Sequence, residues 1–177
     1  MKEIELKVLE INKKLMIKKL LALGAKKVMK RTLFVEKIYD FSDRRLDKHL
    51  HLLRLRQEGK KIFFTFKKLR EKSKFRVADE YQVEVNDYKT MEDILAGLNF
   101  VLLNHREKYR TTFKLGRAMI EIDEYPKIPV FLEIEANKKD LVRALQALDI
   151  PFSRTTNMVN KQVIDHYGLD GKLLKFK

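Results

Sequence analysis

Residues of like charge recur at alternate positions along this chain of 177 residues. The acidic pairs are Glu3 and Glu5, Glu121 and Asp123, and Glu133 and Glu135; the cationic pairs are Arg54 and Arg56, and Lys108 and Arg110. Like charges at this spacing repel, which costs stability unless a ligand neutralises them. A divalent cation neutralises grouped carboxylates, and a phosphate neutralises grouped Arg and Lys side chains. The two kinds of pair together predict a site for a metal ion and a phosphorylated substrate.

The charged pairs lie in segments where polar and apolar residues alternate, which is the period of a β-strand. The predicted strands are 2–10, 33–41, 50–58, 61–68, 77–86, 106–115, 117–125 and 129–136. A sheet with a core on one face and water on the other would also alternate in this way. Such a sheet would not sort its charges by sign, however, and eight strands are enough to close a barrel. We therefore expect the ionised faces to line the inside of a barrel and the apolar faces to form its outside.

Four segments with a helical period interrupt the strands. They are 12–23, a segment opened by Thr90, a segment opened by Asn137, and about 157–167. Asn12 and Asn137 are favourable N-caps. The pattern predicts an α+β fold with one domain over residues 1–177, in which a closed eight-stranded antiparallel β-barrel carries the helices on its outside.

The composition restricts the class of protein and of partner. The hydrophobic fraction of 45% predicts a folded chain, and the net charge of +14 favours an anionic partner: a nucleotide, a polyphosphate, a nucleic acid or a membrane surface. A charge that serves only solubility is the alternative. Cysteine is absent, which excludes thiolate metal sites. No signal peptide or membrane-spanning run is found, so we expect a cytoplasmic protein that binds no membrane. The sequence leaves the oligomeric state open between a monomer and a homodimer.

The order of the charged motifs resembles the CYTH superfamily, the triphosphate tunnel metalloenzymes. Glu3-Ile4-Glu5-Leu6-Lys7 has the form of that family's ExExK signature. The later motifs, in family order, are Leu53-Arg54-Leu55-Arg56, Phe64-Thr65-Phe66-Lys67, Glu80-Tyr81-Gln82-Val83-Glu84, Lys108-Tyr109-Arg110, Glu121-Ile122-Asp123-Glu124-Tyr125 and Leu132-Glu133-Ile134-Glu135. Gln82 stands where many relatives carry a further acid. The resemblance covers nearly the whole chain.

The resemblance implies a tunnel that binds Mg²⁺ or Mn²⁺ together with a triphosphate, with phosphoryl or nucleotidyl transfer as its chemistry. The implied phosphate-binding residues are Lys7, Arg54, Arg56, Lys67, Lys108 and Arg110. The implied metal ligands are Glu3, Glu5, Glu84, Asp123, Glu133 and Glu135, with Glu80 and Glu121 as further candidates. Glu3, Glu5 and Lys7 are the implied catalytic residues. Hard oxygen ligands suit both metals, and Arg offers a planar fork to paired phosphate oxygens.

Three functions are compatible with this pattern. The first is hydrolysis of the terminal phosphate of a nucleoside, thiamine or inorganic triphosphate. The second is the reaction of class IV adenylyl cyclases, which make cyclic AMP and pyrophosphate from ATP. The third is non-catalytic binding of polyphosphate or RNA, which would need the cations but not the carboxylates. We favour hydrolysis of a small-molecule triphosphate (ATP, thiamine triphosphate or tripolyphosphate) over action on an RNA end, because it asks least of the site.

Two further features have a simple explanation. The basic loop 68–76 could gather a long polyanion, but a solvated hairpin explains it as well. The four histidines show no metal-binding spacing. Among them, His49 and His51 alternate onto the face opposite Arg54, so we expect them to point out of the barrel.

Overall fold

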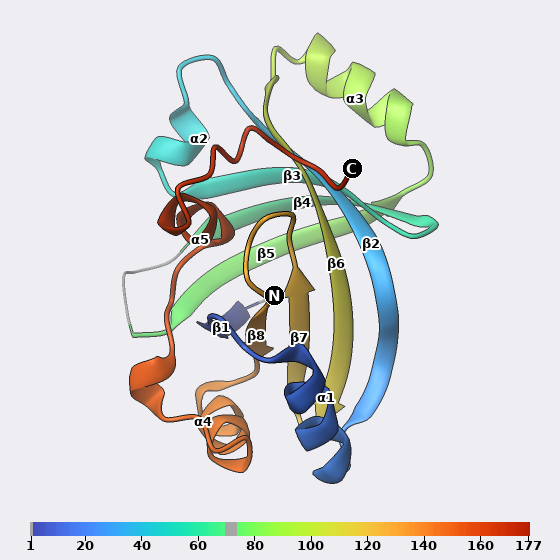
Figure 1. Cartoon of the computed structure of the whole chain (residues 1–177). Helices are drawn as coiled ribbons and strands as arrows, with labels where there is room; N and C mark the ends of the chain where they lie inside the picture. Colours follow the sequence, from blue (N-terminus) through green and yellow to red (C-terminus); the bar gives the residue numbers. More distant parts are fainter. Residues whose placement is uncertain (1, 70–73) are drawn as a thin grey trace.

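The computed structural model describes residues 2–69 and 74–177, without the side chains of residues 2, 3 and 69. In this part of the chain, eight strands form the wall of a barrel and a two-residue strand lies beside it (Figure 1). The strands are β1 (Lys2–Val8), β2 (Lys26–Asp40), β3 (His51–Glu58), β4 (Lys61–Leu69), β5 (Arg76–Val85), β6 (Val101–Leu115), β7 (Ala118–Glu124), β8 (Phe131–Glu135) and β9 (Leu173–Leu174).

The barrel closes because β2 and β6, the two strands at the ends of the sheet, pair with each other. The strand order is β2-β3-β4-β5-β1-β8-β7-β6, and β6 pairs back onto β2. All of these ladders are antiparallel, whereas β9 runs parallel to β6 beside His105 and Arg106. The predicted closed, eight-stranded antiparallel barrel is therefore confirmed.

Two strands are longer than the sequence pattern predicts. β2 and β6 pair from Lys26 opposite Lys114 to Asp40 opposite Val101, whereas the alternation marked only 33–41 and 106–115. Residues 26–31 of β2 are mostly exposed. A strand segment with no buried face carries no apolar alternation, so the pattern could not reveal it.

Five α-helices lie on the outside of the barrel within the described residues. They are α1 (Lys13–Ala22), α2 (Arg45–Lys48), α3 (Tyr88–Gly97), α4 (Lys138–Ala147) and α5 (Asn160–His166), with a 3₁₀ turn at Phe152–Arg154. The side-chain oxygens of Asn12 and Asn137 accept backbone N–H bonds at the starts of α1 and α4, as predicted. α3 begins before Thr90, because Asp87 is the residue that caps it. No helix of the described chain is long and apolar enough to cross a membrane.

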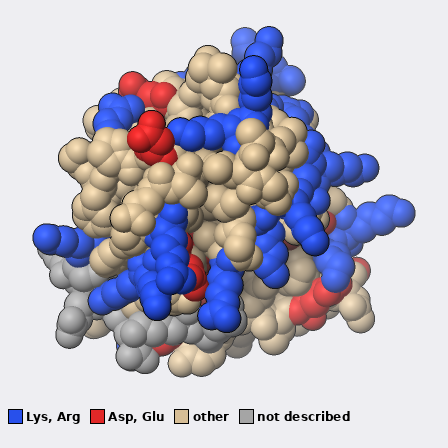
Figure 2. All heavy atoms as spheres, turned by 90° about the horizontal axis from the view of Figure 1, so that it is seen from below, with Lys and Arg blue, Asp and Glu red and all other residues tan. Residues whose placement is uncertain are grey.

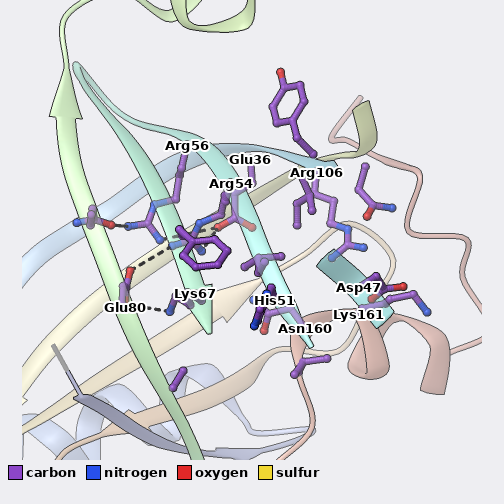
Figure 3. Close-up of a pocket in the computed structure, with 18 of the residues that line it drawn as sticks. Glu36, Asp47, His51, Arg54, Arg56, Lys67, Glu80, Arg106, Asn160 and Lys161 are labelled. Carbon is purple, nitrogen blue, oxygen red and sulfur yellow. Dashed lines mark hydrogen bonds and ion pairs between the residues drawn. The ribbon is translucent and has the colours of Figure 1, made fainter. Parts of the chain in front are cut away.

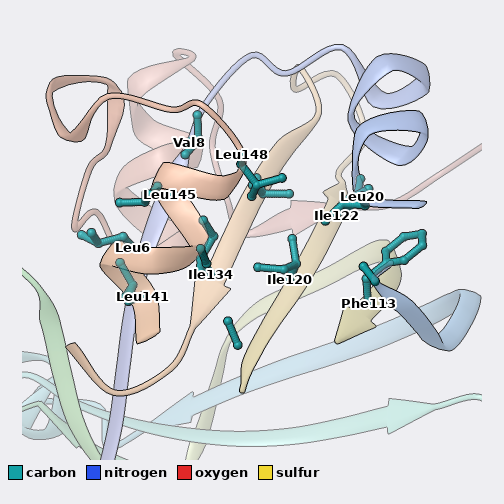
Figure 4. Close-up of a cluster of buried hydrophobic side chains, with 14 residues drawn as sticks. Leu6, Val8, Leu20, Phe113, Ile120, Ile122, Ile134, Leu141, Leu145 and Leu148 are labelled. Carbon is teal, nitrogen blue, oxygen red and sulfur yellow. The ribbon is translucent and has the colours of Figure 1, made fainter. Parts of the chain in front are cut away.

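The main hydrophobic core lies outside the barrel, between its wall and the helices. Leu141 and Leu145 of α4 and Leu20 of α1 pack over Ile120 and Ile134, which point outward from β7 and β8 (Figure 4). Burying each such side chain contributes about 2 kcal/mol. A second apolar cluster lies between α3 and strands β2 to β4, and a third surrounds α5. The apolar faces therefore point outward, and the ionised faces are left to the interior.

Candidate active site

A cavity of about 980 Å³ occupies the inside of the barrel and reaches α2 and the first turn of α5 (Figure 3). All eight strands contribute to its lining. The ionisable residues of the strands that line it are Glu5, Glu36, Asp40, Arg54, Arg56, Lys67, Arg76, Glu80, Arg106, Lys108, Arg110, Glu121, Glu133 and Glu135. Cations and carboxylates nearly balance inside, so most of the net charge of +14 lies on the outer surface. Figure 2 shows Lys and Arg gathered on one such outer face, with few Asp and Glu.

Three cations on β3 and β4 form one wall of the cavity. Lys67 Nζ lies 3.1 Å from Glu80 Oε2, and Arg54 Nη2 lies 3.8 Å from Glu80 Oε1 (Figure 3). The Nε atoms of Arg54 and Arg56 are buried and donate to no acceptor among the described residues. A buried N–H without an acceptor is costly. These two donors are therefore suited to phosphate oxygens, which Arg binds with its planar fork.

Glu36 of β2 connects this wall to the cations of β6. Its Oε1 accepts a hydrogen bond from Arg54 Nη1 at 3.1 Å and lies 3.9 Å from Lys108 Nζ. Burial alone would raise the pKa of Glu36, but Lys108, Arg54 and Arg56 outweigh burial and lower the pKa to about 2. Glu36 is therefore ionised at neutral pH and fixes cations on two strands.

Glu36→Gln should make the stability of the protein less sensitive to acid. A carboxyl whose pKa is lowered by folding stabilises the folded state above its ordinary pKa of 4.5, and that contribution disappears as the pH falls toward about 2. The full effect corresponds to about 3 kcal/mol. We expect the free energy of unfolding in urea to fall less steeply between about pH 5 and pH 3 in the variant than in the wild type. Glu84→Gln, an exposed control, should keep the wild-type slope; parallel slopes for all three proteins would contradict this role for Glu36.

Lys108 and Arg110 of β6 share Asp123 as their partner. Lys108 Nζ donates to Asp123 Oδ2 at 3.0 Å, and Arg110 Nε and Nη2 each donate to an Asp123 oxygen at 2.6 Å. Burial alone would lower the pKa of Arg110, but Asp123, Glu121 and Glu133 raise it well above its ordinary value. Asp123 is fully buried and does not line the cavity. It orients the two cations from behind.

The opposite wall is acidic and contains Glu5 of β1 and Glu133 of β8. Lys7 Nζ lies between them, 2.5 Å from Glu5 Oε1 and 2.8 Å from Glu133 Oε2. Arg76 Nη1 also lies 2.5 Å from Glu5 Oε1. Burial and Glu133 act to raise the pKa of Glu5, but Lys7 and Arg76 outweigh them and lower it to about 2. Both carboxylates are thus held ionised.

Glu121 of β7 extends this acidic wall. It stands directly opposite Glu133 in the ladder between β7 and β8. Burial, together with Glu133 and Asp123, outweighs the nearby Arg110 and raises the pKa of Glu121 to about 8. Carboxylates this close either take up a proton or gain from added positive charge.

The acidic wall has the chemistry for the divalent metal that the family resemblance implies. The ladders place Glu5 opposite Glu135 and Glu121 opposite Glu133, and carboxylate oxygens are the ligands that Mg²⁺ and Mn²⁺ prefer. Among the described residues, no three acidic or histidine side chains already converge on one metal position. Lys7 and Arg110 engage the carboxylates instead. The donors fit, and metal binding would draw carboxylate oxygens away from these cations.

Most of the residues implied by the resemblance line the cavity or lie against it, but Glu84 does not. Its side chain is exposed and its Oε2 lies 3.1 Å from Lys61 Nζ, outside the cavity lining. It shares a strand face with Glu80, but it lies near the end of β5, beyond the enclosed part. The structure therefore places Glu84 apart from the other expected metal ligands, outside the cavity lining. Lys7 is buried behind the lining, and the Glu3 side chain is outside the described residues.

Sequence reasoning did not single out Glu36, Arg76 or Arg106. Glu36 has Phe34 and Ile38 as its neighbours on the same strand face, so no charged pair marks it. Arg76 and Arg106 stand at or just before the starts of predicted strands, where boundaries are least reliable. The spacing could have indicated Arg106, because it lies two residues before Lys108 and therefore shares a strand face with Lys108 and Arg110.

The structure adds one detail to the prediction for His51, which lies at the rim of the cavity. His51 is among the residues at the mouth of the cavity, and its ring packs edge-on against Phe66 with 5.3 Å between centroids (Figure 3). His51 is the first residue of β3 and lies at the edge of the barrel wall. Its side chain therefore reaches the mouth of the cavity although it alternates away from the interior. Of the basic loop 68–76, residues 70–73 lie outside the described part of the chain.

Comparisons of sequence and of structure with known proteins agree with this architecture. The CYTH domain family model matches residues 1–162. The chain is 30% identical over 180 residues to the Methanocaldococcus jannaschii protein called "Putative adenylate cyclase MJ0240", covering 94% of this chain and 99% of that protein. A Vibrio parahaemolyticus structure, called a "putative adenylate cyclase", has a TM-score of 0.79 at 15% identity, covering 92% of this chain and 97% of that one. The Hippeastrum protein HpAC1, called a "putative adenylyl cyclase" with a dominant triphosphatase activity, has a TM-score of 0.68 at 16% identity, covering 95% and 97%.

Proposed function

The chain belongs to the CYTH family, and we propose that it is a metal-dependent enzyme that hydrolyses the terminal phosphate of a triphosphate held inside its barrel. The observation that carries this proposal is the opposition of two walls across one cavity. One wall presents Arg54 and Arg56 with buried donors that lack acceptors, and the other presents Glu5 and Glu133. A triphosphate with a divalent ion would neutralise both walls at once.

The cations would bind and align the phosphate chain. Arg54, Arg56 and Lys67 approach it from β3 and β4, while Lys108 and Arg110 approach it from β6. Glu36 holds Arg54 in place, and Asp123 holds Lys108 and Arg110, so little ordering of these side chains is required when substrate binds. Phosphoryl transfer depends mainly on such positioning and on charge stabilisation.

The acidic wall would hold Mg²⁺ or Mn²⁺ through Glu5, Glu133, Glu121 and Glu135. When bound, the ion supplies charge neutralisation at the phosphoryl oxygens and orients the attacking water. Lys7 keeps Glu5 and Glu133 ionised. The closed wall limits access of bulk water, which strengthens the electrostatic interactions inside.

We favour a small-molecule triphosphate as the substrate. The fold is shared with HpAC1, for which a dominant triphosphatase activity is stated, and hydrolysis requires no site for a nucleoside. The second candidate, formation of cyclic AMP from ATP, is favoured by one observation. The cavity continues past the cations to Leu52 and Asn160, where an adenosine could be placed. The name of the archaeal relative points the same way.

One incubation series separates these functions. Purified protein is given ATP, thiamine triphosphate or tripolyphosphate, each with Mg²⁺, with Mn²⁺ or with EDTA, and orthophosphate, pyrophosphate and cyclic AMP are measured. We expect metal-dependent release of orthophosphate, which EDTA abolishes and added metal restores. Arg54→Gln should reduce this activity, whereas Lys61→Gln, which removes an exposed cation, should not.

The other outcomes have definite meanings. Cyclic AMP together with pyrophosphate would select the cyclase. Absence of turnover, with tight binding of tripolyphosphate that persists in EDTA, would select the non-catalytic binder and overturn the proposal.

A further inference from the structure

We propose that Arg106 binds a substrate phosphate at the end of the cavity nearest α5, and that the C-terminal segment holds its guanidinium in position. The identity of the anion as a phosphate rests on the proposed function. Arg106 lies on β6, lines the cavity and is 2% exposed (Figure 3).

Arg106 differs from the other cations inside the barrel in its charge balance. Each of the others lies within 4.0 Å of at least one carboxylate oxygen. Arg106 has no such ion pair with any described residue. A buried charge without a counter-charge is costly, and Arg cannot escape the cost by losing its proton. A buried, uncompensated guanidinium that faces a cavity therefore calls for an anionic ligand.

The nearby carboxylates are already engaged elsewhere. Glu36 stands opposite Arg106 in the ladder between β2 and β6, but its carboxylate accepts from Arg54. Asp40 accepts the backbone N–H groups of Leu46 and Asp47, each at 3.0 Å, and so holds α2. Both carboxylates thus already accept from other donors, and neither forms an ion pair with Arg106.

The C-terminal segment fixes the guanidinium through one backbone carbonyl. Arg106 Nε donates to Gly171 O at 3.0 Å, and Asn104 Nδ2 donates to the same oxygen at 3.0 Å. The strand β9 that follows Gly171 pairs with β6 at Arg106 itself. The remaining donors of Arg106 form no hydrogen bond with the described residues, so the forked end is held in place and available to a phosphate.

Arg106 also continues an existing row of cations. It shares one face of β6 with Lys108 and Arg110, at intervals of about 7 Å. The row therefore reaches from the acidic wall to the mouth near Asn160 and Lys161 (Figure 3). Arg106 would contact the phosphate of the chain that lies farthest from Arg110.

Gly171 provides a way to move this guanidinium without replacing it. A Cβ added at Gly171 would lie 2.9 Å from Arg106 Nη2 and 3.3 Å from its Cζ. Gly171 has no left-handed φ, so alanine is compatible with its backbone. At Gly97 an added Cβ meets nothing within 4 Å and the φ is also ordinary, so Gly97→Ala is a matched control.

The test compares Arg106→Gln, Arg106→Lys, Gly171→Ala and Gly97→Ala with the wild type. The dissociation constant for tripolyphosphate is measured by calorimetry in EDTA, where metal-dependent turnover is stopped, and KM and kcat are measured with Mg²⁺. We expect Arg106→Gln to weaken binding about tenfold or more and to raise KM more than it lowers kcat. Arg106→Lys and Gly171→Ala should fall between Arg106→Gln and the wild type, and Gly97→Ala should match the wild type.

Thermal unfolding of the ligand-free proteins separates a binding role from a structural one. Removal of an uncompensated buried charge should leave the midpoint of Arg106→Gln equal to that of the wild type or raise it. A lowered midpoint with unchanged tripolyphosphate affinity would show that Arg106 only anchors the C-terminal segment, and would overturn the proposal. Absence of tripolyphosphate binding by the wild type would overturn it too. Weaker binding by Arg106→Gln without any turnover in the wild type would support this inference while the proposed hydrolysis fails.

Discussion

Glu5→Gln is expected to lower metal-dependent turnover by about a thousandfold while the fold is retained. Glutamine keeps the shape of the side chain and an oxygen that can accept from Lys7 and Arg76, so the barrel should close as before. The lost negative charge, however, is one of those that would hold the divalent ion. The measurement is orthophosphate release from tripolyphosphate at saturating Mg²⁺, alongside the thermal midpoint of the variant.

The matched control for Glu5→Gln is Glu84→Gln. The sequence motif assigns both residues to the metal, but the structure places Glu84 outside the cavity in a pair with Lys61. Glu84→Gln should therefore keep nearly full activity. Equal losses in the two variants, or full activity of Glu5→Gln, would show that the acidic wall is not where the metal acts.

Arg110→Met is expected to destabilise the folded protein by about 3–5 kcal/mol. Arg110 makes two hydrogen bonds to Asp123 and one to Glu133, and all three side chains are buried. Methionine keeps only the aliphatic part of the side chain, so the principal change is that Asp123 and Glu133 each lose one of their cationic partners and Glu121 loses its pairing with Arg110. The measurement is the free energy of unfolding from urea denaturation at neutral pH.

Lys114→Met is the control for Arg110→Met. Lys114 lies four residues further along β6 and is exposed, so its removal should change the stability by less than about 0.5 kcal/mol. A loss of similar size in both variants would mean that the effect comes from the strand and not from the buried charge network.

The sequence allowed the wall of the barrel to be predicted because each strand has two chemically distinct faces. Ile120 and Ile122 alternate with Glu121 and Asp123, and the structure sends the first pair outward under the helices. The sorting of charge by sign identified the interior as a ligand site and not a solvated surface. These signals are local in sequence, so one chain was enough to reveal them.

Features that depend on contacts between distant strands could not be read in this way. Glu36 has no charged neighbour on its own strand face, and its importance comes from Arg54 and Lys108, which other strands bring to it. Asp123 is expected from the sequence to be a metal ligand, and its place behind Lys108 and Arg110, whose side chains it accepts hydrogen bonds from, could not be read from the sequence. The net charge of +14 also does not describe the interior. The cations and carboxylates that line the cavity nearly balance, and the excess of positive charge lies on the outer surface.

The closure of the barrel has a consequence for how the chain folds. Its seam joins residues 26–40 to residues 101–115, whereas the hairpins from β3 to β5 join near neighbours. Pairing of segments so distant in sequence is slow, because the entropy of a large loop must be lost first. Until the seam forms, β2 and β6 expose unpaired edges that can associate with other chains. Refolding from denaturant should therefore be slow and give lower yields at high protein concentration, and an anion that draws the two halves of the interior together should hasten it.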